Sequence, residues 1–194
     1  MESAVSHFPT LLLCALLGAA VWHDVRARRI PNAVVFPGML AALALQALLP
    51  AGTGLFGAHA GGLGLVSALG GLGLGLAVLM PLYALRLMGA GDVKLLAMVG
   101  AFVGAGQIMS VALVTLLAGG VLALAVAAWQ RNLGRVVGNA RRMVVHGGVS
   151  ALAGMGARFA PPAAAHGRLP YALAIATATV GCVAWMHTFG ELPL

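Results

Sequence analysis

Long apolar runs, separated by short polar or glycine-rich breaks, dominate this 194-residue chain. A helix needs about 20 mostly apolar residues to cross the hydrocarbon core of a bilayer. Six stretches reach or approach that length: residues 7–24, 32–49, 61–87, 92–103, 107–129 and 169–189. We expect the fourth, which is short for a full span, to be tilted or partial. The pattern therefore predicts an all-α, polytopic membrane helix bundle of about six transmembrane helices.

The composition agrees with a membrane protein. Hydrophobic residues make up 61% of the sequence and charged residues 8%, and the mean hydropathy is +1.02. Soluble domains carry about 25% charged residues. A compact soluble fold of this length would leave too much apolar surface in water, and a disordered chain would be far more polar. We therefore expect a single integral membrane domain over residues 1–194.

The basic residues indicate how the chain is oriented. All eleven fall on one side of the six-span topology: Arg26, Arg28, Arg29, Arg86, Lys94, Arg131, Arg135, Arg141, Arg142, Arg158 and Arg168. The loops on the other side, residues 51–60 and 104–106, carry none. The positive-inside rule then places the basic side in the cytoplasm and both termini outside. We expect residues 131–168 to form a basic cytoplasmic loop before the last helix, with an amphipathic segment lying on the lipid bilayer.

Other ligand classes find less support in the sequence. A net charge of +7 would suit nucleic-acid binding, but no aromatic-rich polar surface accompanies it. Cys14 and Cys182 stand far apart in apolar runs and form no CxxC pair, which is typical of small buried hydrophobic residues. We therefore expect no nucleic acid, no metal and no cofactor. In the third span, the GxxxG step of Gly71 and Gly75 predicts close approach of a neighbouring helix.

Acidic residues are rarer still. There are four, and two of them, Glu2 and Glu191, sit at the chain ends. The other two, Asp24 and Asp92, lie at the end of the first span and the start of the fourth, on the same predicted face. Two neighbouring carboxylates share one proton and titrate as a unit. The ionised member can take a proton from water while the protonated member donates to a carbonyl oxygen, as in aspartic proteases.

Three simpler hypotheses account for the same polar residues. Asp92 would serve only as a helix N-cap, and Asn32 would cap the second helix. Asp24 would serve only as a charge partner of Arg26 or Arg28 near the interface. Paired aspartates would also suit a cation or proton path, which leaves open a small transporter or proton-conducting bundle. A non-enzymatic assembly subunit of a secretion system is a further possibility.

The residues around the two aspartates resemble a known family. Asp24 is followed by Arg29-Ile30-Pro31-Asn32, and the second site reads Gly89-Ala90-Gly91-Asp92-Val93-Lys94-Leu95. Leu169-Pro170-Tyr171-Ala172 resembles a proline–aromatic segment that opens the last helix of that family. With these motifs the chain is similar to the prepilin peptidases, GxGD-type aspartic membrane proteases of type IV pilus and type II secretion systems.

The resemblance assigns roles to individual residues. It implies that Asp24 and Asp92 are catalytic, and that Gly89 and Gly91 shape the site. Further site-shaping or substrate-binding positions would be Pro31, Asn32, Lys94, Pro170 and Tyr171. Lys94 would orient the site or contact lipid phosphate.

The same resemblance implies a cellular role. Family members cleave the short basic leader from prepilins at the cytoplasmic face of the bacterial inner membrane. The longer members also carry a CxxC segment ahead of the first aspartate and methylate the new N-terminus. This sequence has no such segment, so we expect a peptidase without methyltransferase activity, similar to those of tight-adherence (Flp) pilus systems.

Overall fold

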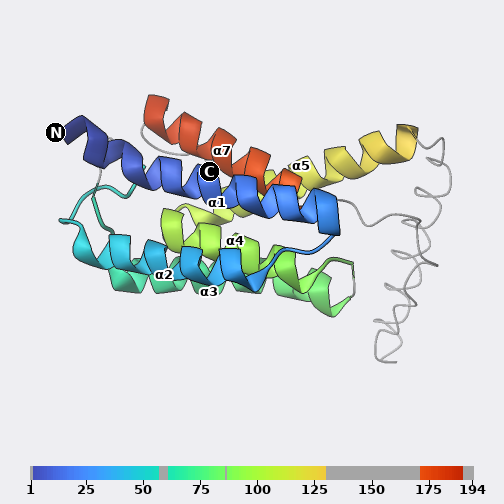
Figure 1. The fold of residues 1–194 in the computed structure, drawn as a ribbon, viewed down its shortest axis with the longest axis horizontal. Coiled ribbons are helices and arrows are strands. Elements are labelled where there is room, and N and C mark those ends of the chain that lie inside the picture. Colours follow the sequence, from blue (N-terminus) through green and yellow to red (C-terminus); the bar gives the residue numbers. More distant parts are fainter. Residues whose placement is uncertain (1, 57–60, 86, 130–170, 190–194) are drawn as a thin grey trace, which may run out of the picture.

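A computed structural model describes residues 2–56, 61–85, 87–129 and 171–189 of the chain. Within these residues the fold consists of helices α1 (Glu2–Ala27), α2 (Asn32–Leu48), α3 (Leu65–Ala84), α4 (Ala90–Val103), α5 (Ile108–Trp129) and α7 (Tyr171–Phe189) (Figure 1). Extended backbone pairing in the described part is limited to an isolated bridge between Ala51 and Gly62. The prediction of an all-helical bundle is confirmed.

The lengths of the helices fit a protein that crosses the membrane several times. Among the described residues, four helical segments are long and apolar enough to span it: Phe8–Ala27, Leu65–Ala84, Ile108–Val126 and Tyr171–Phe189. Helix α2 has 17 residues and α4 has 14. At 1.5 Å per residue, α4 is about 21 Å long, which is less than the hydrocarbon thickness of about 30 Å. The short length predicted for this element is confirmed.

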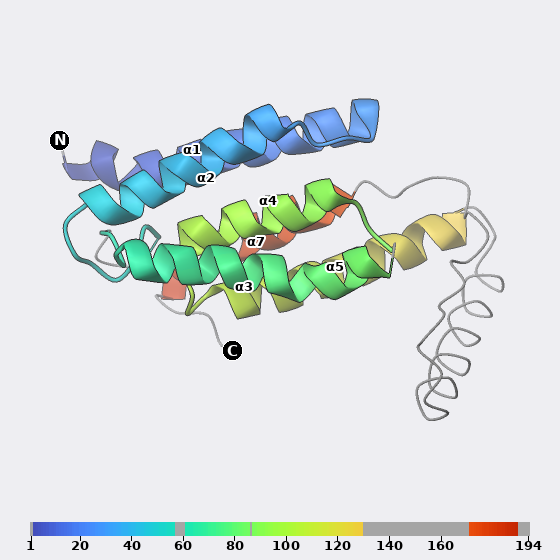
Figure 2. The same ribbon diagram turned by 90° about the horizontal axis from the view of Figure 1, so that it is seen from below.

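Helix α4 lies at the centre of the bundle. It contacts α1, α2, α3, α5 and α7, and every residue from Leu95 to Val103 is buried. A helix that is apolar on all sides is surrounded by protein or by lipid, and here the burial of α4 shows that protein surrounds it. The other helices supply this protein environment, and Figure 2 shows α1 and α2 in one layer, α4 and α7 in the middle, and α3 with α5 in a third layer.

Glycines allow α3 and α4 to pack backbone against backbone. A Cβ atom at Gly71 would collide with the carbonyl oxygen of Gly100, and one at Gly100 would collide with that of Gly71. One turn further along α3, a Cβ at Gly75 would lie 2.7 Å from the Leu96 carbonyl oxygen. The close approach predicted from the GxxxG step is thus present, and the partner is α4.

The boundaries of α3 differ from the prediction of residues 61–87. The helix begins at Leu65 because the preceding glycines belong to a folded connection: the Gly62 N–H donates to the Pro50 carbonyl, 2.8 Å away, and the Gly52 N–H donates to the Gly62 carbonyl at 3.1 Å. The helix ends at Ala84. Helix α1, by contrast, is longer than the predicted 7–24 and continues to Ala27.

A buried glutamine closes the bundle at the end where α2 and α3 are connected. Gln46 is 1% exposed. Its Nε2 donates to the carbonyl oxygen of Phe102 on α4 at 2.8 Å, and its Oε1 accepts a hydrogen bond from the Leu63 N–H at 2.7 Å. Buried polar groups in a membrane protein need internal partners, and these two bonds join α2, α4 and the connection before α3.

The opposite end of the bundle carries both aspartates. The α1–α2 connection (residues 28–31), the α3–α4 connection (residues 85–89) and the first residue of α7 lie together there (Figures 1 and 2). We call this the aspartate end.

Candidate active site

Asp24 lies in the last turns of α1 and is 8% exposed. Its Oδ2 accepts a hydrogen bond of 3.3 Å from the backbone N–H of Ala172, in the first turn of α7. The first N–H groups of a helix have no partner within that helix, so they are available to a carboxylate. The fold therefore connects the end of α1 to the start of α7, which is 148 positions later in the chain.

The basic residues after Asp24 take different positions. The guanidinium of Arg26 lies over the ring of Trp22, 5.3 Å from its centroid. The positive charge of Arg28 acts on the Asp24 carboxylate. Arg28 also has a left-handed backbone (φ +52°), and its N–H donates to the Asp24 carbonyl at 2.8 Å. This conformation ends α1 and turns the chain towards α2. Arg28 is thus an electrostatic neighbour of Asp24, while Arg26 lies over Trp22.

Asp92 is in the first turn of α4, but it is not the N-cap. The cap is Gly89, and Asp92 lies three residues later. Its Oδ2 accepts a hydrogen bond from the Gly89 N–H at 3.2 Å, and its own N–H donates to the Gly89 carbonyl, also at 3.2 Å. This is the backward half of a capping box. The hypothesis that Asp92 is the N-cap of α4 is therefore wrong. Its carboxylate nevertheless accepts a hydrogen bond from a backbone N–H at the start of the helix.

Helix α7 packs against both of the helices that carry the aspartates. Ala172 donates its N–H to Asp24, and the negative charge of Asp92 acts on the hydroxyl of the preceding residue, Tyr171. Helices α1, α4 and α7 also contact one another in pairs. The two acidic residues are far apart in the sequence, and they lie on helices that both pack against α7. Tyr171 was a predicted site residue, whereas Ala172 contributes a backbone group that no side-chain pattern indicates.

The two predicted motifs also touch each other directly. A Cβ atom at Gly91 would lie 3.1 Å from the Cβ of Ile30, so the glycine lets the side chain of Ile30 lie against the start of α4. The Nζ of Lys94 donates to Oδ1 of Asn32 at 3.1 Å and lies 5.3 Å from the ring centroid of Phe36. The Lys94 ammonium therefore joins α4 to α2.

The Lys94 contact also revises the predicted role of Asn32. The N-cap of α2 is Pro31, with an extended backbone and no side-chain capping bond. Asn32 is the first helical residue, and its side-chain oxygen binds Lys94. The prediction that Asn32 caps α2 is therefore wrong. The sequence contains a cation in one motif and a side-chain amide in the other. Only the folded structure shows that the two lie close enough to form a hydrogen bond.

The remaining predicted positions give less information. Gly89 has an ordinary extended backbone (φ −82°), and a Cβ there would lie 3.3 Å from Oδ2 of Asp92. Pro170 and the predicted loop at 131–168 lie outside the described residues. In the described ranges, no group of three or more histidine, cysteine, aspartate or glutamate residues is arranged to hold a metal ion.

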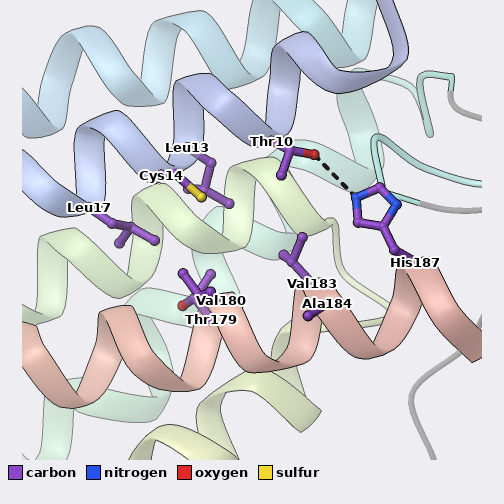
Figure 3. A pocket seen from close by; sticks show the side chains of 9 residues that line it. All are labelled: Thr10, Leu13, Cys14, Leu17, Thr179, Val180, Val183, Ala184 and His187. Atoms are coloured by element: carbon purple, nitrogen blue, oxygen red, sulfur yellow. Dashed lines mark hydrogen bonds between the residues drawn. The ribbon is translucent and has the colours of Figure 1, made fainter. Parts of the chain in front are cut away.

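An apolar cavity of about 160 Å³ lies between α1 and α7, further along the two helices from Asp24 and Ala172 (Figure 3). Thr10 and His187 meet at one side of it, with Oγ1 and Nε2 3.3 Å apart. Its lining residues are Thr10, Leu13, Cys14, Leu17, Thr179, Val180, Val183, Ala184 and His187. The cavity includes neither aspartate.

Comparison with known families gives a match over residues 11–124 to the type IV leader peptidase family. The matched segment covers more than half of the chain. It includes Asp24 and Asp92, and also Asn32 and Lys94, which join α2 to α4. No curated protein and no solved structure matches the chain significantly. With this match and its multi-pass helical fold, the chain belongs to the type IV leader peptidase family of membrane proteases.

Proposed function

We propose that this protein is an aspartic membrane endopeptidase that removes the basic leader from prepilin-like substrates, with Asp24 and Asp92 as its catalytic pair. The observation that carries the proposal is the position of both carboxylates at one end of the bundle, where α1, α4 and α7 pack against one another. Asp24 accepts the Ala172 N–H, and the charge of Asp92 acts on Tyr171. Membership in a leader peptidase family favours proteolysis over ion transport as the use of these two residues.

The proposed reaction is the hydrolysis of one peptide bond. The ionised aspartate removes a proton from a water molecule, and the water oxygen attacks the carbonyl carbon of the scissile bond. The protonated aspartate donates its proton to the carbonyl oxygen as the tetrahedral intermediate forms. When the C–N bond breaks, the departing nitrogen takes up a proton from the pair, and the other product keeps the new carboxyl group.

Other residues of the aspartate end would hold this pair in place. The Gly89 N–H binds Oδ2 of Asp92, and the Ala172 N–H binds Oδ2 of Asp24. Backbone donors of this kind are fixed by the helices that carry them, so each carboxylate is oriented before substrate arrives. Lys94, through Asn32, would fix α4 against α2, and thereby the position of Asp92.

The proposed location of the reaction is the cytoplasmic face of the bacterial inner membrane. Arg26, Arg28, Arg29 and Lys94 are all at or beside the aspartate end, and no basic residue occurs in the connections at the opposite end. The positive-inside rule supports a cytoplasmic position for the basic end. A substrate leader on that side could reach the aspartates without crossing the bilayer.

The test is to co-express the full chain with a candidate prepilin and to read the pilin N-terminus by mass spectrometry. We expect Asp24→Asn and Asp92→Asn each to reduce cleavage by about 10² to 10⁴-fold, because each removes one acid–base group. Glu2→Gln and Glu191→Gln are the matched controls, since they neutralise the only other acidic residues. Mature pilin in either aspartate variant at the wild-type level would contradict the proposal.

A further inference from the structure

Gly119 in the middle of α5 has a neighbour that explains why it is glycine. A Cβ atom there would collide with the ring of Tyr171, lying 2.6 Å from the hydroxyl oxygen and 2.7 Å from Cζ. Gly120, the next residue, has nothing within 4 Å of the same position and is exposed. A glycine inside a helix is less stable than alanine. At Gly119 the absence of a side chain leaves room for an aromatic ring from another helix.

The ring that rests on Gly119 belongs to the first residue of α7. The residue after Tyr171 donates its N–H to Asp24, and the charge of Asp92 acts on the Tyr171 hydroxyl. Helices α5 and α7 pack against each other extensively. The ring can yield by turning about its two χ angles or by moving together with its backbone, and a backbone shift at Tyr171 would also move the Ala172 N–H.

We propose that Gly119 is a positioning residue: its bare backbone seats the Tyr171 ring and so sets where α7 begins between Asp24 and Asp92. This role involves α5, a helix that carries neither aspartate. Its effect on catalysis rests on the proposed function. A methyl group at Gly119 would push the ring away from α5 and move the Ala172 N–H relative to Asp24.

The first test measures cleavage kinetics of the purified full chain in lipid nanodiscs with a prepilin substrate. We expect Gly119→Ala to lower kcat by about 10- to 100-fold, since a small misplacement of a catalytic group has effects of this size. Gly120→Ala, the matched control, should stay within about twofold of wild type. If the wild-type chain cleaves and Gly119→Ala cleaves equally fast, the positioning role is overturned.

A double-mutant cycle shows whether Gly119 acts through Tyr171. In a Tyr171→Ala background the ring is absent, so adding Gly119→Ala should cause little further loss. Independent, additive losses would contradict the proposal, because they would mean that the methyl group disturbs something other than the ring.

A third measurement reports geometry without relying on proteolysis. Cysteines are placed at positions 24 and 172 in a chain that also carries Cys14→Ala and Cys182→Ala, and the rate of disulfide formation is followed on gels. The rate depends on how close the two positions lie. Gly119→Ala should slow it, and Gly120→Ala should not. If Gly119→Ala slows the cross-link while the wild-type chain, with Asp24 intact, cleaves no prepilin, the proposed function is rejected and the positioning role is supported. An equal cross-linking rate in both variants would overturn the latter.

Discussion

The backbone N–H of Ala172 donates a hydrogen bond to Oδ2 of Asp24 across 3.3 Å, and it thereby fixes the last described helix of the bundle onto the first. This donor is an ordinary backbone amide at the start of a helix. It matters because the fold places it beside the Asp24 carboxylate. Four experiments test this contact and others that hold the helices of the bundle together.

Replacing Ala172 by proline removes the N–H that binds Asp24. Proline is tolerated in the first turn of a helix because the N–H there has no helical partner. We therefore expect α7 to form while the carboxylate loses its donor, and leader cleavage to fall by about 10- to 100-fold, as for loss of a hydrogen bond to a charged group. Leu173→Pro removes the next N–H of the same turn and is the control, so equal losses in both variants would argue against the Asp24 contact.

The hydrogen bond between Lys94 and Asn32 couples α4 to α2. Removing one exposed partner, in Lys94→Met or Asn32→Ala, should lower the free energy of unfolding by about 0.5–1.5 kcal/mol. In the double variant the two losses should not add, because only one contact is lost. Asn32→Asp should retain it, since a carboxylate still accepts from the ammonium. The measurement is reversible unfolding in mixed micelles, and strictly additive losses would disprove the coupling.

The backbone contact of Gly71 with Gly100 makes α3 intolerant of any side chain at that position. Gly71→Ala should cost about 1–3 kcal/mol or more, because the colliding atoms belong to the backbone of α4 and cannot rotate away. Gly73→Ala lies on the same helix with nothing within 4 Å of its Cβ, so it should be neutral or slightly stabilising. The comparison is made by thermal unfolding of the two purified variants. Similar melting temperatures would contradict the packing described here.

Gln46→Leu removes the hydrogen-bond partner of the buried Phe102 carbonyl and that of the N–H of Leu63, a partly exposed residue. Loss of the buried bond to Phe102 should cost about 1–3 kcal/mol in the free energy of unfolding, and loss of the Leu63 bond should cost less because that contact is only partly buried. Hydrogen exchange should also increase at Leu63, whose amide would no longer be bonded. Unchanged exchange at that amide would show that the glutamine is dispensable.

The sequence was sufficient to predict the six helices of the described residues, because long apolar runs in a membrane protein usually form helices. It was weaker wherever an outcome depends on a partner from elsewhere in the chain. Gly61 and Gly62 are predicted to be helical from the sequence. Their backbones instead form hydrogen bonds with residues 50–54, so α3 starts at Leu65.

The candidate site divides in the same way. Asp24, Asp92, Lys94 and Asn32 are visible in the sequence because side chains carry their chemistry. The prediction that Asn32 caps α2 is wrong, because the Asn32 side-chain oxygen accepts a hydrogen bond from Lys94 of α4. Ala172 and Gly119 escaped notice because one contributes only an amide and the other only the lack of a side chain. Neither property has a signature along the chain until the helices are side by side.

Helix α4 is held at both of its ends. At one end Gln46 binds the Phe102 carbonyl, and at the other Lys94 binds Asn32, with both partners on α2. Two attachments to the same neighbouring helix act as a strut of fixed length, so Asp92 cannot slide along the membrane normal unless α2 moves with it. Any rearrangement that admits a polypeptide to the aspartates should therefore move α2 and α4 together as one unit.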